Sequence, residues 1–331
     1  MPKAKSLLLK KIQGAQITQI VYVMARLGIA DFINQEERSL DEISEELGLS
    51  LLLLQRLFPA LESTNLVKRL PNGRYALTDE GLLLRKQEED SLYHLAMYKS
   101  APFVWRAMEY FCEGLSSGES PFELAHGTHL FDYLENNTEA NTLFQDAMSH
   151  FERHSSKALI DLYDFSSFKH ITDLGGGNGS FLHSVLERYP DLKALNFDLS
   201  HVIEKARRIV QHSSIEHREG SFFEQIPGDS DAFLLRNILH DWSDESCLEI
   251  LKTIYRDSRP DSKLLLIETL ISSSPDSKLG RFSNITMFMM TPGGRERSEE
   301  DLLDLCAQSG FIHTETIRCS GSKSLLEFTK K

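Results

Sequence analysis

Three glycines at alternate positions mark the middle of this 331-residue chain: Gly175, Gly177 and Gly179. The residues before them, 169–174, predict a short strand, and residues 180–188 predict an amphipathic helix. Glycine at such a junction allows a tight turn and lets the backbone approach a ligand, while the start of the helix offers free N–H groups. The segment therefore constrains this part of the chain to a βα unit with a ligand at its turn.

The next predicted strand, 193–198, ends in a carboxylate, Asp198, about twenty residues after the glycines, where a ribose can hydrogen-bond. The dinucleotide fingerprint would place its last glycine at position 180, but that residue is Ser180 and the glycine falls at Gly179. The form Asp-x-Gly-x-Gly-x-Gly is more similar to the nucleoside loop of S-adenosylmethionine (SAM) dependent methyltransferases. The motif alone also allows a nicotinamide cofactor.

Composition limits the remaining classes of protein. The chain is long enough for two domains, and 41% hydrophobic with 26% charged residues is typical of a globular protein. A net charge of −13 argues against nucleic acid as a partner, because phosphates require a basic surface. No apolar run approaches the ~20 residues of a membrane span, so we expect a cytoplasmic protein without a membrane partner. Four scattered cysteines without a C-x-x-C pair predict reduced thiols and no metal.

The first hundred residues predict helices followed by a hairpin. Ser39 and Glu42 form a capping-box pattern at the start of one helix, and Gly48 ends that helix. Another predicted helix, 51–61, is followed by two short strands around a turn at 71–73. This order of helix, helix and hairpin is the pattern of a winged helix.

A winged helix can bind DNA or hold subunits together. The candidate recognition helix, 51–61, offers only Gln55 and Arg56 to a groove, whereas DNA-reading helices display several basic or amide side chains. Together with the acidic net charge, this favours a structural or dimerisation role.

The second half of the chain predicts an α/β fold with a doubly wound, mainly parallel sheet, because apolar strands alternate with helices. The predicted strands are 169–174, 193–198, 231–236, 262–269 and 324–329.

A candidate acid–base group follows these strands. His240 comes directly after strand 231–236, at the sheet edge where ligands of open α/β folds bind, and its titration range suits a general base. Glu268 closes strand 262–269 and Glu296 lies in a turn before a helix, so either could orient the histidine. A packing or surface histidine is the alternative, as is a solvated charge pattern around Glu296. The residues alone leave these readings open.

Three further segments carry a family resemblance: Leu239–Glu245, Phe197–Ile203 and Gly293–Ser298. With the glycine loop, they follow the order and spacing of SAM-dependent small-molecule O-methyltransferases, which the chain resembles over nearly its whole length. That family includes plant caffeate and flavonoid enzymes, acetylserotonin methyltransferase and bacterial enzymes of antibiotic and pigment biosynthesis. The resemblance implies a Rossmann-like class I methyltransferase sheet, an N-terminal all-α winged-helix dimerisation domain and a homodimer.

The resemblance also implies a domain division and a set of residue roles. The domains are a winged-helix-like dimerisation domain (1–100), a helical linker region that lines the acceptor pocket (101–164) and a SAM-binding domain (165–331). His240 would be the catalytic base, flanked by Glu268 and Glu296, with no metal. SAM, which becomes S-adenosylhomocysteine, would be bound by Asp173, Gly175, Gly177, Asp198, Leu199, Gly220, Ser221, Phe222, Phe223, Arg236 and Asn237. The acceptor would contact Phe144, Met148, Asp241, Met287 and Thr291.

Two residues depart from the family pattern. Ser221 stands where relatives often carry Asp, and a hydroxyl is a poorer acceptor for the adenine amino group. Asn284 stands where many relatives carry Asp. The expected reaction is methylation of a hydroxyl, typically phenolic, of a small aromatic or polyketide-like molecule. Two other functions fit the same residues: non-methylating chemistry in a SAM-binding enzyme of this fold, and ligand sensing by a winged-helix regulator.

Overall fold

The computed structural model describes residues 2–88, 90–151, 153–271, 278–319 and 323–331. The chain forms two compact units. The first comprises Met1–Trp105 and Thr142–Phe151, and the second comprises Arg106–Asn141 and Glu152–Lys331. The segment 101–164 therefore contributes to both units.

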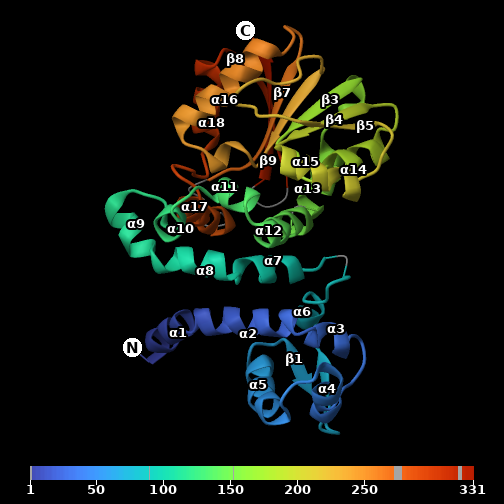
Figure 1. The fold of residues 1–331 in the computed structure, drawn as a ribbon, viewed down its shortest axis with the longest axis vertical. Helices are drawn as coiled ribbons and strands as arrows, with labels where there is room; N and C mark the ends of the chain where they lie inside the picture. Colours follow the sequence, from blue (N-terminus) through green and yellow to red (C-terminus); the bar gives the residue numbers. More distant parts are fainter. Residues whose placement is uncertain (1, 89, 152, 272–277, 320–322) are drawn as a thin grey trace. The chain divides into compact units, whose positions relative to one another are not determined.

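The first unit is helical apart from one small hairpin (Figure 1). The expected all-α domain therefore also contains a two-stranded sheet. Its elements before residue 100 are α1 (Pro2–Ile12), α2 (Gly14–Arg26), α3 (Ile29–Ile33), α4 (Leu40–Leu47), α5 (Leu51–Ser63), β1 (Val67–Arg69), β2 (Tyr75–Leu77), α6 (Asp79–Leu82) and α7 (Tyr93–Lys99). The predicted capping box of Ser39 and Glu42 is confirmed, and Gly48 ends α4 with a φ of 63°. The predicted hairpin is confirmed as an antiparallel pair in which Val67 is opposite Leu77.

Further helices precede the larger sheet. They are α8 (Pro102–Glu109), α9 (Phe111–Ser117), α10 (Pro121–His126), α11 (Leu130–Glu135), α12 (Thr138–Phe151), α13 (Arg153–Leu162) and the short η1 (Phe165–Ser167). None of the helices in the described ranges is both long and apolar enough to cross a membrane.

A seven-stranded sheet forms the centre of the second unit, in the order β5-β4-β3-β6-β7-β9-β8. Its strands are β3 (His170–Leu174), β4 (Lys193–Asp198), β5 (Ile215–Glu219), β6 (Ala232–Arg236), β7 (Lys263–Thr269), β8 (Phe311–Arg318) and β9 (Lys323–Lys330). The strands from β5 to β7 run parallel, and β9 is antiparallel to both β7 and β8. This confirms the predicted mainly parallel sheet. The chain order reverses between β3 and β6, the switch point at which such sheets bind ligands.

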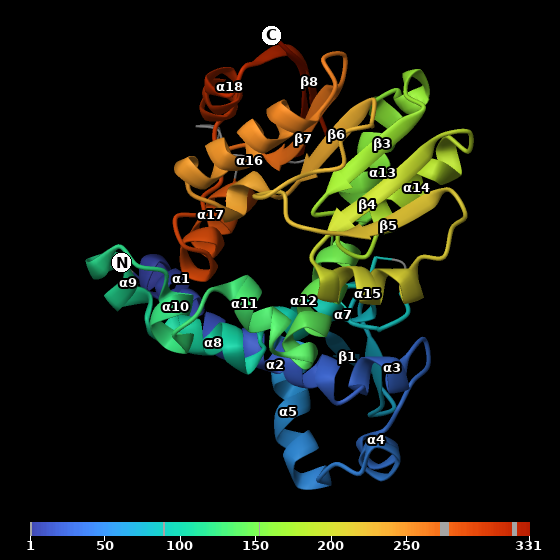
Figure 2. The same ribbon diagram turned by 45° about the horizontal axis from the view of Figure 1, so that its top comes forward.

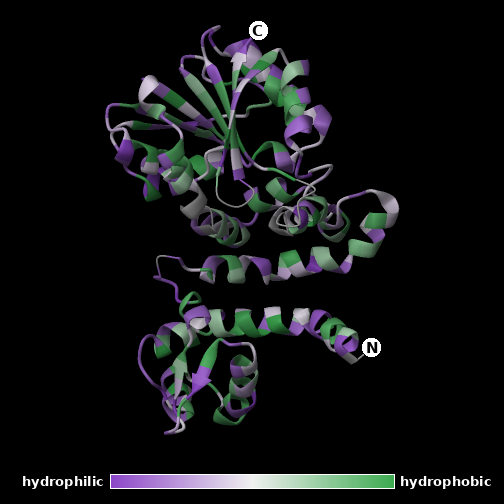
Figure 3. Cartoon of the chain, turned by 180° about the vertical axis from the view of Figure 1, so that it is seen from behind, coloured by the Kyte–Doolittle hydropathy of each residue, from purple (hydrophilic) through white to green (hydrophobic). Residues whose placement is uncertain are grey.

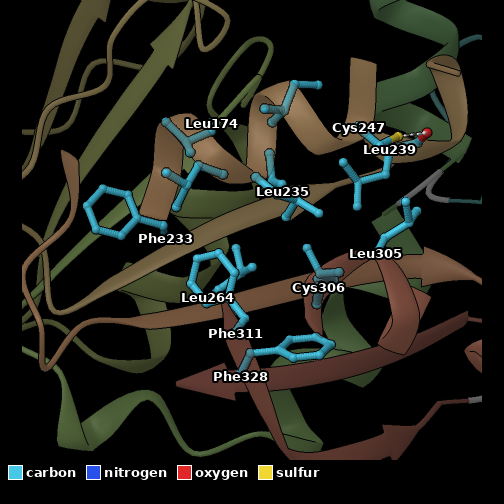
Figure 4. Packing of buried hydrophobic residues seen from close by; sticks show 14 of the residues in the cluster. Leu174, Phe233, Leu235, Leu239, Cys247, Leu264, Leu305, Cys306, Phe311 and Phe328 are labelled. Carbon is cyan, nitrogen blue, oxygen red and sulfur yellow. Dashed lines mark hydrogen bonds between the residues drawn. The ribbon is translucent and has the colours of Figure 1, made fainter. Parts of the chain in front are cut away.

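Helices lie on both faces of this sheet (Figures 1 and 2). They include α14 (Ser180–Arg188), α15 (Ser200–Ile209), α16 (Asp244–Asp257) and α18 (Glu299–Gln308). The helix α17 (Lys278–Met290) instead packs against α10. Adjacent residues of a strand point to opposite faces. Leu235 accordingly joins a cluster with Cys247 of α16 and Leu305 of α18 (Figure 4), whereas Leu234 joins a second cluster with Phe181 of α14. Figure 3 shows that the middle strands of the sheet are rich in hydrophobic residues, which contribute to these two clusters.

Two strands of the sheet, β5 and β8, were not predicted. In β5 only Ile215 is buried, and in β8 only Phe311 is buried. Both strands lie at the edges of the sheet, where side chains face solvent and no apolar run is needed. A search for runs of apolar residues therefore detects the inner strands and misses the two edge strands.

Replacing Phe233 by Ala tests the larger core. The Phe233 side chain is 1% exposed within β6, and we expect its truncation to lower the free energy of unfolding of the second unit by about 3–5 kcal/mol. Chemical denaturation measures this change. Ile312→Ala on edge strand β8, where the side chain is 49% exposed, is the control and should change the free energy by less than about 0.5 kcal/mol. Equal effects of the two substitutions would contradict the assignment of the core.

Candidate active site

The glycine segment lies between β3 and α14, as predicted, and its three alternate glycines are left-handed. The φ angle is 75° at Gly175, 59° at Gly177 and 79° at Gly179, a region that other residues rarely adopt. The N–H of Gly177 donates to Asp198 Oδ2 at 2.8 Å, and the N–H of Leu199 donates to Asp198 Oδ1 at 2.7 Å. The Asp198 carboxylate thus shapes the loop, while each of its oxygens keeps a second lone pair for a ligand.

Two buried side chains beside this loop have acceptor atoms without a hydrogen bond. Both carboxylate oxygens of Asp173 and Oδ1 of Asn196 lack a partner within the described part of the chain, and both residues are fully buried. Burial raises the pKa of Asp173 to about 6, although the Arg236 guanidinium opposes this shift. Buried polar groups without a partner are costly and rare. The position therefore fits a ligand that brings N–H or O–H donors.

An aromatic segment borders the loop on the side of β5. Residues Gly220–Phe223 follow this strand directly. The rings of Phe222 and Phe223 meet the Trp242 ring edge to face, with centroid distances of 6.4 and 4.7 Å. A Cβ placed on Gly175 would lie 3.5 Å from the Phe222 ring. The predicted cofactor residues thus gather at the carboxyl ends of β3, β4, β5 and β6.

The turn after β6 connects this loop to His240. Asn237 has a φ of 54°, and its side-chain oxygen accepts a hydrogen bond from Lys323. The next residue, Ile238, places Cδ1 only 2.4 Å from the position that a Cβ on Gly175 would take. The glycine loop therefore packs directly against the turn that carries His240, and a larger residue at position 175 would require the Ile238 side chain to move.

The three residues predicted to be catalytic lie together. His240 lies on η2 (Leu239–Asp241), directly after β6. Its Nδ1 is 3.1 Å from Glu296 Oε1 and 3.8 Å from Glu268 Oε2, while its Nε2 is 3.7 Å from Asp241 Oδ1. Only the contact with Glu296 has hydrogen-bond length. Glu296 therefore orients the imidazole ring.

The two glutamates are held by different groups. Glu268 Oε1 accepts the backbone N–H groups of Ile238 at 3.1 Å and Leu239 at 2.9 Å, so this side chain fixes the backbone of the turn. Glu296 Oε1 accepts a hydrogen bond from Ser283 Oγ at 2.5 Å, and the Glu296 N–H donates to Asn284 Oδ1 at 3.0 Å. The Glu296 side chain is 1% exposed, which excludes the solvated charge pattern.

Charge around His240 favours its protonated form. Burial alone would lower the pKa of His240, but Asp241, Glu268 and Glu296 together raise it to about 10. Burial raises the pKa of Asp241 to about 7 and also raises the pKa of Glu268. Burial would raise the pKa of Glu296 as well, but the hydrogen bond with His240 lowers it. The favoured state is an imidazolium paired with the Glu296 carboxylate.

The same three residues have the spacing of a cation site. His240 Nδ1 and carboxylate oxygens of Glu268 and Glu296 lie within 4.8 Å of one another, and they are the only such group in the described ranges. The hydrogen bond between Nδ1 and Glu296 requires a proton at the position that a metal ion would take. The arrangement therefore suits proton transfer.

Arg297 supports the turn and was not predicted. Its side chain is 1% exposed. Nη1 donates to the carbonyl of Leu239 at 2.5 Å, Nη2 donates to the carbonyl of Trp242 at 2.8 Å, and Nε donates to Asp244 Oδ1 at 3.0 Å. The planar guanidinium thereby ties η2 to the first turn of α16. Its only signal in the sequence is its place after Glu296, which a surface arginine would share.

The predicted acceptor residues belong to both units. Met287 on α17 is half-buried, and the buried Thr291 donates its hydroxyl to the Met287 carbonyl at 2.8 Å. Phe144 and Met148 lie half-buried on α12, where the Phe144 ring meets Tyr98 with a centroid distance of 5.6 Å. Their contact with an acceptor stays a prediction.

Asp173→Asn tests the cost of the buried carboxylate. Because the native pKa of Asp173 lies above the unfolded value of 3.8, the native state binds the extra proton, and stability is lost as pH rises from about 4 to about 6. The amide does not titrate. We expect the variant to gain up to roughly 3 kcal/mol over the wild type above pH 6 and to lose this advantage near pH 4. Thermal unfolding across this range measures the difference, and a difference independent of pH would contradict the assignment.

The chain is similar to known O-methyltransferases in both sequence and structure. A family model of the O-methyltransferase domain matches residues 108–312, and one of the O-methyltransferase dimerisation domain matches residues 9–86. The phenazine O-methyltransferase of Lysobacter antibioticus is 30% identical, with 97% of this chain and 95% of the relative covered. The solved structure of LaPhzM is 29% identical with a TM-score of 0.93, and 99% of each chain is covered.

A further solved structure is an O-methyltransferase from neocarzinostatin biosynthesis in complex with SAM and 2-hydroxy-5-methyl naphthoic acid. It is 26% identical with a TM-score of 0.81, and the alignment covers 95% of this chain and 96% of that one. The fold, the glycine loop and these matches agree. The chain belongs to the family of SAM-dependent O-methyltransferases.

Proposed function

We propose that this enzyme transfers the methyl group of SAM to a phenolic hydroxyl of a small aromatic molecule, with His240 as general base. The observation that carries the proposal is the position of His240. Its Nδ1 is hydrogen-bonded to the buried Glu296, and its ring lies on the turn that packs against the glycine loop. A proton acceptor and a nucleoside cradle thus adjoin at the switch point of the sheet.

The residues of the cradle fit SAM. Asp198 would accept the ribose hydroxyls, the aromatic segment at Phe222 would border the adenine, and the unpaired oxygens of Asp173 would accept from the ammonium group. When bound, SAM supplies an electrophilic methyl group on a sulfonium. The protein must then hold the acceptor oxygen in line with that methyl group and remove its proton.

The electrostatics of His240 supports proton removal. A phenol has an ordinary pKa near ~10 and is mostly protonated at neutral pH. An unperturbed histidine would accept this proton unfavourably, because its pKa is about 6.5. Only the neutral form of His240 has a free Nε2, so the base is the deprotonated fraction of the enzyme, which grows as pH rises toward 10. Because the carboxylate neighbours raise the pKa of His240 to about 10, this neutral form takes the proton from the acceptor oxygen at little cost in free energy. Nε2 is the nitrogen that Glu296 does not engage.

The acceptor class rests on the relatives and on the predicted pocket residues. The names of the relatives specify a phenazine and a hydroxynaphthoic acid, both aromatic. Met287 of the second unit would supply apolar surface for a flat ring. We therefore propose an aromatic acceptor and leave its ring system to a panel of phenols assayed with SAM.

We also propose that the enzyme is a homodimer. The dimerisation-domain match and the exposed apolar residues of α1, namely Leu7, Leu8, Leu9 and Ile12, support this. Light scattering of the purified chain should give twice the mass of 37.7 kDa. A monomer at micromolar concentration would contradict the proposal.

Replacing His240 by Ala tests the base. We expect the rate of methyl transfer to a simple phenol to fall by roughly 10²–10⁴-fold, while the dissociation constant of SAM stays close to that of the wild type. A more acidic phenol loses its proton without a strong base, so its rate of methylation in His240→Ala should fall by a smaller factor. His212→Ala, at a half-buried histidine of the same unit outside the site, is the control. An unchanged rate in His240→Ala, or equal losses for both phenols, would overturn the role of His240.

A further inference from the structure

Both sides of the Gly177 peptide are held by side chains of β4. The N–H of Gly177 donates to Asp198 Oδ2 at 2.8 Å, and the carbonyl of Gly177 accepts from Asn196 Nδ2 at 3.0 Å. Asn196 and Asp198 are two residues apart on a strand, so they point to the same side. The predicted site includes Asp198 but not Asn196, which makes the second of these two contacts.

A histidine on the neighbouring strand orients this asparagine. His217 of β5 is the direct partner of Asn196 in the register of the sheet, and its Nδ1 is 3.2 Å from Asn196 Nδ2. An amide nitrogen only donates, so His217 Nδ1 accepts. His217 Nε2 then carries the proton and donates to the carbonyl of Val210 at 3.0 Å. The neutral tautomer of His217 therefore fixes which way the Asn196 amide faces.

The other end of the Asn196 amide faces the buried acceptors of the site. A Cβ on Gly176 would lie 2.2 Å from Asn196 Oδ1 and 2.9 Å from Asp173 Oδ2, so the two oxygens border the same point of the loop. Asp173 is the direct partner of Asn196 on β3. Asn196 Oδ1 is fully buried and has no hydrogen bond within the described ranges. Asp173, Asn196 and His217 thus form a row across three neighbouring strands beneath the loop. The Asp173 carboxylate and Asn196 Oδ1 in this row can accept hydrogen bonds from a ligand.

We propose that Asn196 is a cofactor-binding residue and that His217 is the positioning residue that orients it. Asn196 Nδ2 holds the Gly177 carbonyl, and Asn196 Oδ1 joins Asp173 in accepting from the ammonium group of SAM. His217 acts only through Asn196. This inference rests on SAM as the cofactor and is independent of the role of His240.

Binding of SAM and S-adenosylhomocysteine, measured by calorimetry without an acceptor, tests this assignment. Asn196→Leu has nearly the same shape but leaves the Gly177 carbonyl unsatisfied, and we expect a dissociation constant at least about tenfold higher. His217→Leu should raise it several-fold. His217→Asn can place its amide oxygen where Nδ1 lies, so its affinity should stay within about twofold of the wild type.

His170→Asn is the matched control. His170 is a half-buried histidine at the start of β3, and its Nδ1 is hydrogen-bonded to Ser230 Oγ at 2.7 Å. It lies at the opposite end of the sheet from the glycine loop, so its replacement should leave SAM affinity unchanged. Thermal unfolding of each variant reports on the fold.

Three results would overturn the assignment. Wild-type affinity for SAM in both Asn196→Leu and His217→Leu would exclude the proposed roles. A reduced turnover number with unchanged SAM affinity would also exclude them, because it indicates a structural role. A His217→Asn variant as weak as His217→Leu would exclude orientation through Nδ1. If the wild-type enzyme did not bind SAM, the proposed function would fail as well. If the Asn196 and His217 variants bound SAM like the wild type and only His240→Ala lost turnover, the proposed function would remain and this assignment alone would fail.

Discussion

Three carboxylates around one imidazole are the constraint on which this site depends. Glu268 and Glu296 are buried, and Asp241 lies on the other side of His240, so negative charge removed from water surrounds the imidazole. Buried charges are tolerated only when paired and hydrogen-bonded. The backbone N–H groups that bind Glu268 and the hydroxyl of Ser283 that binds Glu296 supply part of this compensation. The rest is the positive charge on His240 and that on Lys323, which favours the ionised form of both glutamates.

The backbone of the turn is arranged to keep this charge balance. Asn237 is left-handed, Glu268 accepts from the two following N–H groups, and Arg297 holds the carbonyls of the same turn from the interior. Cys247 adds a contact to the Leu239 carbonyl at 3.2 Å (Figure 4). Because Ile238 packs on Gly175, the turn that carries His240 and the glycine loop are in direct contact.

Much of this arrangement could be predicted from the sequence, because its signals are local. The glycine loop follows a buried strand directly, and His240 follows another at the same edge of the sheet. What could not be predicted depends on neighbours distant in the chain. Strand β5 is polar because it lies at an edge, so the pairing of His217 with Asn196 had no pattern to reveal it. Arg297 resembles a surface residue until its burial is known.

A titration of His240 by nuclear magnetic resonance, with isotope-labelled histidine and the wild-type enzyme, tests the central claim most directly. We predict that His240 of the resting enzyme is still an imidazolium at pH 8 and loses its proton near pH 10, because Asp241, Glu268 and Glu296 raise its pKa. A midpoint near the ordinary histidine value of about 6.5 would show that the carboxylates do not hold the proton on His240, and it would contradict the match with a phenolic acceptor.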